Sequence, residues 1–112
     1  MLAAIAVSDS AVLAAEPAKV KLGGSVYLDA ETCAKGTTSP DCQLIFEITG
    51  KSAKAIYDGM AGKGEMQECT GEVEKFDESG MHCIKGKTAA DYLCDFGYNF
   101  KKAEFGGGGD GC

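Results

Sequence analysis

The sequence predicts an α+β fold in which one short helix packs on a small antiparallel sheet and disulfides staple the chain. Three observations support this class. Apolar residues alternate with polar ones in residues 42–48 and again in residues 91–100, as in half-buried strands. Between these segments, residues 49–60 switch to a helical period. Six cysteines are spread along the 112 residues, and this even number is typical of a disulfide framework in a small exported domain.

The clearest predicted strand is CQLIFEI, residues 42–48, in which Gln43 and Glu47 point away from the apolar side. A shorter strand is expected at residues 25–28, after a turn at Gly23-Gly24. The apolar side of the longer strand carries Cys42, Leu44, Phe46 and Ile48.

The segment TGKSAKAIYDGM then predicts a short amphipathic helix, with Thr49 or Ser52 as its N-terminal cap. Residues 61–64, AGKG, end it. The apolar stripe of this helix consists of Ala53, Ile56, Tyr57 and Met60.

Three further strands are predicted as a meander, at residues 68–76, 81–85 and 91–100. In the last of these, Tyr92, Cys94, Phe96 and Tyr98 alternate with polar positions, and we expect the helix stripe to cover them. His82 and Asp95 fall on the opposite, polar side, where a solvated strand face is expected.

The cysteine spacing predicts disulfides and therefore an oxidising compartment. Cys83 and Cys94 would lie opposite each other in a hairpin that turns near Thr88. Cys33 with Cys42 would close the loop between them, which leaves Cys69 with Cys112. Other pairings stay open, because six cysteines allow many connectivities.

Two patterns typical of phosphate or metal sites do not fit. A phosphate loop requires a glycine five residues before its Gly-Lys-Thr triplet, but Met81 stands there before Gly86-Lys87-Thr88. His82 is the only histidine, and it would point to the opposite strand face from Cys83. We expect no catalytic residue, no metal and no cofactor.

The formal net charge of −6 argues against nucleic-acid binding, which needs a basic face. Acidic residues concentrate between positions 65 and 78, where Lys75 is the only cation. Such a stretch is either a solvated strand face and turn or a surface for a cationic protein partner. The candidate partner-binding residues are Glu65, Glu68, Glu72, Glu74, Asp77 and Glu78.

Three regions are expected along the chain. Residues 1–15 are apolar and either resemble an export signal or pack as part of the protein, and they are too short and broken to span a bilayer. Residues 16–105 form a single α+β domain. Residues 106–112 form a glycine-rich tail that ends in Cys112. The expected location is periplasmic or extracellular.

Two resemblances accompany these patterns. The segments FEITGKSAKAIYDGM, GMHC and YLCDFGYNF resemble small uncharacterised exported bacterial proteins with a cysteine-bearing β-meander, a resemblance that implies no activity and no site residue. The N-terminal LAAIAV is similar to the start of the long helix of type IV pilins.

We therefore expect a non-enzymatic exported protein that acts by protein–protein binding, as an inhibitor, an immunity protein or an accessory factor. A stapled framework without a catalytic set favours this function. The alternative is a structural subunit of an extracellular filament or surface assembly, which would self-assemble through its apolar N-terminal segment.

Overall fold

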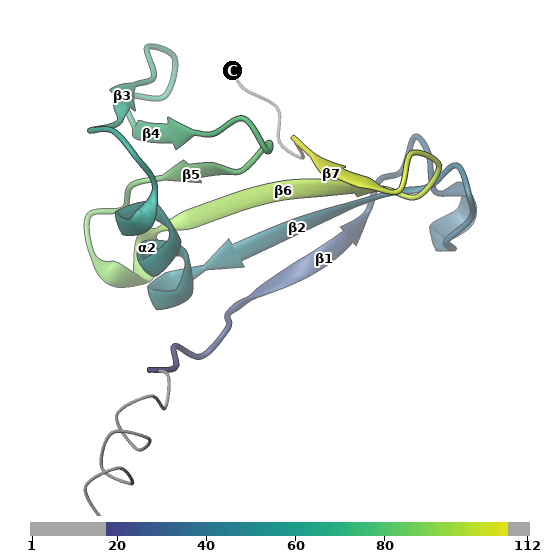
Figure 1. The fold of residues 1–112 in the computed structure, drawn as a ribbon, viewed down its shortest axis with the longest axis horizontal. Helices are drawn as coiled ribbons and strands as arrows, with labels where there is room; N and C mark the ends of the chain where they lie inside the picture. Colours follow the sequence, from purple (N-terminus) through teal and green to yellow (C-terminus); the bar gives the residue numbers. More distant parts are fainter. Residues whose placement is uncertain (1–17, 108–112) are drawn as a thin grey trace, which may run out of the picture.

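The computed structural model describes residues 18–107, which form one sheet with a single α-helix packed on it (Figure 1). The predicted segment 1–15 and all but the first two residues of the predicted tail lie outside these residues. Within residues 18–107, no helix has the length and apolar character needed to cross a membrane. The elements are β1 (Gly24–Leu28), η1 (Ala34–Gly36), β2 (Gln43–Thr49), α2 (Gly50–Gly59), β3 (Glu65–Met66), β4 (Val73–Phe76), β5 (His82–Ile84), η2 (Ala89–Asp91), β6 (Leu93–Asn99) and β7 (Glu104–Gly106).

The sheet is antiparallel, and β6 lies at its centre. β2 runs along the whole of one side of β6, while β5 and β7 pair with different halves of its other side. β4 and β3 extend the sheet beyond β5, and β1 forms the opposite edge beside β2. The predicted α+β class, with one helix on an antiparallel sheet, is therefore confirmed.

The first strand of the predicted meander differs from the prediction. Residues 68–70 form a turn, and β4 begins only at Val73. Gly71 has a φ of +75° and donates its N–H to the carbonyl of Gln67, so the chain reverses there. Glu65–Met66 forms the separate short strand β3 as a result.

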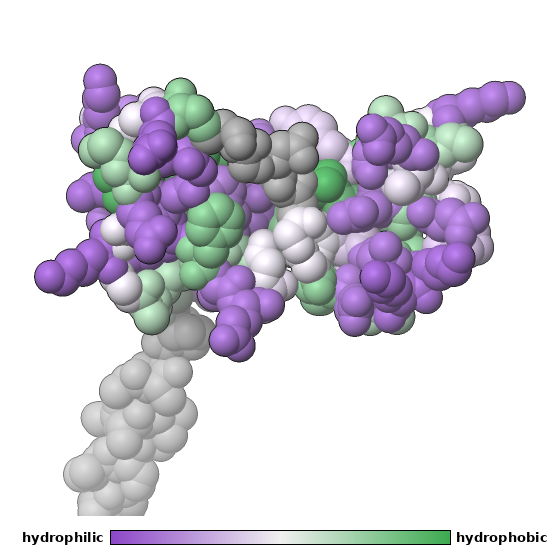
Figure 2. All heavy atoms as spheres, turned by 90° about the horizontal axis from the view of Figure 1, so that it is seen from above, coloured by the Kyte–Doolittle hydropathy of each residue, from purple (hydrophilic) through white to green (hydrophobic). Residues whose placement is uncertain are grey.

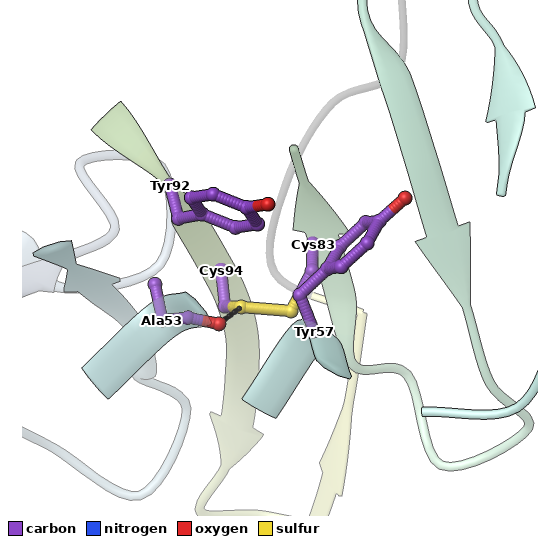
Figure 3. Close-up of a cluster of buried hydrophobic side chains, with 5 residues drawn as sticks. All are labelled: Ala53, Tyr57, Cys83, Tyr92 and Cys94. Atoms are coloured by element: carbon purple, nitrogen blue, oxygen red, sulfur yellow. Dashed lines mark hydrogen bonds between the residues drawn. A yellow bond between two sulfur atoms is a disulfide. The ribbon is translucent and has the colours of Figure 1, made fainter. Parts of the chain in front are cut away.

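The core lies under α2, at one end of the sheet (Figure 3). The ring of Tyr57 on α2 meets the ring of Tyr92 edge-on, with centroids 5.4 Å apart. The Cys83–Cys94 disulfide lies between these rings and the sheet (Figure 3). Ala53 and Tyr57 of the predicted stripe are buried, while Ile56 and Met60 pack against the cluster from its margin.

The start of α2 is built differently from the prediction. Thr49 occupies the N-cap position but makes no side-chain cap hydrogen bond. Ser52 instead accepts the N–H of Gly23 at 3.0 Å and donates to the carbonyl of Thr49 at 2.9 Å. This hydroxyl therefore ties the first turn of the helix to the chain entering β1. The helix ends at Gly59, just before the predicted AGKG break.

Two predicted disulfides are confirmed within the described residues, Cys33–Cys42 and Cys83–Cys94. Cys83 and Cys94 are direct cross-strand partners on β5 and β6, as the hairpin register predicts. Described cysteines include no free thiol. The pairing of Cys69 with Cys112 stays a prediction, because Cys112 lies outside the described residues.

The Tyr57 hydroxyl is a small source of instability in this core. It is buried, and within residues 18–107 it has no hydrogen-bond partner. Burial, acting against the charged phenolate, raises the pKa of Tyr57 above its ordinary value of 10.0. We expect Tyr57→Phe to be neutral or to stabilise the protein by up to about 1 kcal/mol, because it removes an unsatisfied group and keeps the ring. Urea unfolding monitored by circular dichroism measures this, and a loss above about 1 kcal/mol would show that the hydroxyl is satisfied in solution.

Candidate functional site

The helix covers only one end of the sheet, and the same face continues past it as an apolar surface. In the register of β1, β2 and β6, Val26 lies opposite Phe46, and Phe46 lies opposite Phe96. Because side chains two residues apart share a face, this row lies on the side of the sheet that carries Cys94 and α2. We call the surface the aromatic face, and it comprises Val26, Leu28, Phe46, Phe96, Tyr98 and Phe105.

The rings of the aromatic face contact one another across three strands. Phe46 and Phe96 are stacked with centroids 4.8 Å apart and planes 6° apart. Tyr98 and Phe105 are cross-strand partners on β6 and β7, and their centroids also lie 4.8 Å apart. Cross-strand aromatic pairs stabilise a sheet by a few tenths to about 1 kcal/mol each. The face is therefore an ordered platform.

This platform is partly open to solvent. Phe105 is 61% exposed and Val26 is 50% exposed, while Phe46 and Phe96 are half-buried. Beside them, a hollow of about 380 Å³ lies between the chain entering β1 and the rings of Phe46 and Phe96. Exposed apolar surface of this kind marks interaction sites more often than isolated exposed residues do.

The edge strand β1 borders the hollow, and within residues 18–107 no strand pairs with its outer side. The N–H of Asp29 donates to the carbonyl of Gln43, and the carbonyl of Gly23 accepts the N–H of Thr49, both at 3.0 Å. Odd-numbered residues therefore face β2. Along an antiparallel strand, the backbone N–H and C=O groups of successive residues point alternately to one side and the other. The groups of the even-numbered residues Gly24, Val26 and Leu28 therefore point to the open edge.

The opposite face of the sheet is polar around β1 and contains a buried charged cluster farther along. On that side, the Tyr27 hydroxyl donates to Glu47 at 3.0 Å, and this hydrogen bond raises the pKa of Tyr27 above its ordinary value of 10.0. The two faces thus differ in chemistry, and among the described residues the continuous apolar surface beside the edge is the aromatic face.

The buried cluster joins three strands through His82. Its Nε2 lies 3.0 Å from Glu74 Oε2, and its Nδ1 lies 3.2 Å from Asp95 Oδ2. All three residues are at most 9% exposed, and Phe76 stacks on the imidazole with centroids 4.4 Å apart. The predicted solvated positions of His82 and Asp95 are therefore wrong. Both ring nitrogens are engaged, so neither is free to exchange a proton with a substrate.

The acidic residues predicted to bind a partner separate into different environments. Glu74 is buried against His82 and Gln67, which removes it from an exposed surface. Asp77 accepts hydrogen bonds from Ser79 and from the N–H of Met81, and these bonds, led by that from Ser79, lower its pKa below 3.8. Asp77 thus shapes the β4–β5 turn. The remaining four are exposed: Glu65, Glu68, Glu72 and Glu78.

Cations and apolar side chains interrupt these exposed acids. Glu72 lines the same hollow as Lys85 and Lys87. Figure 2, which looks down on the β3–β4 end, shows hydrophobic residues interspersed with hydrophilic ones there. Six acids that are close in sequence therefore do not form one continuous acidic field. Whether the exposed members bind a cationic partner stays a prediction.

Comparisons with known proteins add no functional information. The chain matches no protein-family model, no curated protein and no solved structure. The resemblances to exported bacterial proteins and to pilins therefore stay predictions. The features that bear on function are the geometry of the aromatic face and of the edge strand beside it.

The sequence predicted that Phe46, Phe96 and Tyr98 lie on apolar strand faces, but their surroundings differ from the prediction. Phe96 and Tyr98 were expected beneath the helix, and the structure places them beyond it. β7 was not predicted, although the apolar Phe105 following the charged Glu104 is the signal that marks it. This strand also extends the ordered domain through Gly106, one residue into the predicted tail.

Proposed function

We propose that this chain is a non-enzymatic exported binding protein, of the inhibitor, immunity or accessory type, whose aromatic face receives an extended apolar segment of a partner protein. The observation that carries the proposal is the ordered, half-open row of rings beside a free strand edge. Addition of a strand to an exposed sheet edge is a recurrent mode of peptide recognition, in which the backbone supplies affinity and side-chain pockets supply specificity.

The composition of the face suits a protein partner. Aromatic residues are enriched at binding hot spots, where they bury a large area at a small cost in side-chain entropy. The hollow at Phe46 and Phe96 is large enough for one or two apolar side chains of an incoming segment. Side chains along a strand point alternately to the two faces of the sheet. Every second side chain of a partner strand along β1 would therefore lie on the aromatic face, beside this hollow.

Two further observations agree with an exported, non-enzymatic protein. The two disulfides suit an oxidising compartment, such as the periplasm or the extracellular space. His82 has both ring nitrogens held by buried carboxylates, which suits a structural role better than proton transfer.

Site-specific photocrosslinking in the exporting host tests the proposal. A photoreactive phenylalanine analogue replaces Val26, which lies on β1 at the hollow and is 50% exposed, or, as the control, Phe76 on the opposite face, which is 60% exposed. We expect a discrete adduct from position 26 and none of the same mass from position 76. Equal adducts at both positions, or no adduct at 26, would contradict the proposal.

Binding of the purified partner then assigns the surface. We expect Val26→Asp to weaken binding at least tenfold, because it places a charge in an apolar contact, and Phe76→Asp to leave the affinity unchanged. The double variant Glu68→Lys/Glu72→Lys reports on the exposed acids. A loss of binding in this variant alone would place the partner on the acidic residues and refute the role of the aromatic face.

A further inference from the structure

We propose that the segment added at β1 is β1 of a second copy of this chain, so that two protomers join into one continuous sheet about a two-fold axis at Val26. The inference rests on the proposed function, because it uses the same edge and the same face. It names the occupant and fixes the register, which pairs residue Val26 with its own copy.

Backbone geometry supports this register. A two-fold axis through Val26, perpendicular to the sheet, places Val26 of one copy opposite Val26 of the other. The N–H and C=O groups of Val26 point to the open edge, so the two copies can exchange hydrogen bonds there. Leu28 of one copy then lies opposite Gly24 of the other, so its side chain meets no opposing side chain. An axis at any other residue of β1 is also compatible with the outward groups, but only the axis at Val26, the midpoint of the strand, pairs all five residues of one copy with all five of the other.

Charges flanking β1 favour the antiparallel pairing of two copies. Lys21 precedes the strand by three residues, and Glu31 follows it by three. With the axis at Val26, Lys21 of each copy lies at the same end of the paired strands as Glu31 of the other copy. The two-fold symmetry creates two such pairs, one at each end. Both side chains are exposed in one protomer. Such pairs between copies set register and orientation more than they set affinity.

The strand itself carries no feature that protects an edge. Its sequence, GSVYL, contains no charge and no proline. Proteins usually protect edges with charged residues, proline, bulges or very short strands. Pairing at Val26 would bury Val26 and Leu28, which are 50% and 36% exposed, and would join the two aromatic faces across the axis.

The other edges of the sheet do not compete. β3 is only two residues long. Glu65, its first residue, and Glu68, which follows the strand, are both exposed. β7 has three residues, of which Glu104 is charged and exposed. Short, charged edges of this kind disfavour pairing. Within residues 18–107, β1 is therefore the edge best suited to a second copy.

Sedimentation equilibrium of the purified full chain, with its disulfides intact, tests the pairing. We expect a reversible dimer in the wild type and at least a tenfold weaker one in Val26→Pro. Proline removes an N–H that points outward, so the hydrogen bonds from β1 to β2 are kept and the circular dichroism spectrum should not change. A wild type that stays monomeric at about 1 mM, or a dimer unaffected by Val26→Pro, would overturn the inference.

A charge swap tests the antiparallel pairing of the two copies independently of folding. Lys21→Glu places like charges together and should weaken the dimer several-fold, whereas Lys21→Glu combined with Glu31→Lys should restore it. A double variant as weak as the single one would reject this pairing. A monomeric chain that still forms the adduct at position 26 with another protein would reject the second copy and leave the proposed function intact.

Discussion

Replacing Cys83 and Cys94 together by alanine is expected to lower the free energy of unfolding by about 2–5 kcal/mol. The disulfide closes a loop with a sequence separation of 11 between β5 and β6, and both half-cystines are fully buried under α2. Its loss restores chain entropy to the unfolded state and also leaves a gap between the sheet and Tyr57. For a chain of 112 residues, this is a large part of the total stability.

The Cys33–Cys42 disulfide provides a matched control. Its sequence separation of 9 is close to 11, so the loop-closure contributions are nearly equal, because they depend on the logarithm of loop length. Its half-cystines are also buried, but they close the η1 loop and lie outside the cluster beneath α2. Guanidinium unfolding of the two double-alanine variants should therefore show the larger loss for Cys83/Cys94, by about 1 kcal/mol. Equal losses would show that packing beneath α2 adds nothing to the disulfide.

The strand register could be predicted because side-chain direction has a period of two. Once Cys83 and Cys94 are placed on strands joined by a turn near Thr88, only a narrow range of registers brings them opposite each other. The helix could be predicted for a similar reason, since Ala53 and Tyr57 repeat at the spacing of one helical turn. Both signals are local, and tertiary packing did not override them.

The extent of the helix cover could not be predicted from these patterns. A ten-residue helix is about 15 Å long, whereas a seven-residue strand such as β6 is about 23 Å long. One helix therefore leaves part of β6 uncovered. The direction in which the helix crosses the sheet decides which part that is. Alternation placed Phe96 on the correct face but did not reveal that this face becomes open beyond Cys94.

The polar side of the sheet was misjudged for a related reason. Alternation assigns His82, Glu74 and Asp95 to one face, but it does not show whether that face is solvated. Their mutual contacts depend on the pairing of β4, β5 and β6, which brings together residues up to 21 positions apart. In the sequence, Glu74 is one of several acidic residues close together. In the fold, it contacts His82 within a buried cluster that also includes Asp95.

Removing the imidazole of this cluster is expected to cost about 3–5 kcal/mol of stability. In His82→Leu, Glu74 and Asp95 would stay buried without the ring that lies 3.0 and 3.2 Å from them. Deleting one member of a buried hydrogen-bonded cluster leaves the other members buried without the contacts that offset their desolvation, which is the most costly way to change it. Asp95 is the more vulnerable carboxylate, because its Oδ1 already has no hydrogen-bond partner within residues 18–107.

Replacing both carboxylates by amides in the His82→Leu variant separates two contributions to the lost stability: the burial of unpaired carboxylates and the loss of packing around the imidazole. We expect Glu74→Gln/Asp95→Asn to recover at least half of the stability that His82→Leu removes, because no buried charge then remains unpaired. Chemical unfolding of the wild type, the single variant and the triple variant measures this recovery. No recovery would mean that the stacking of Phe76 on His82, and not the two carboxylate contacts, is what this residue contributes to the sheet.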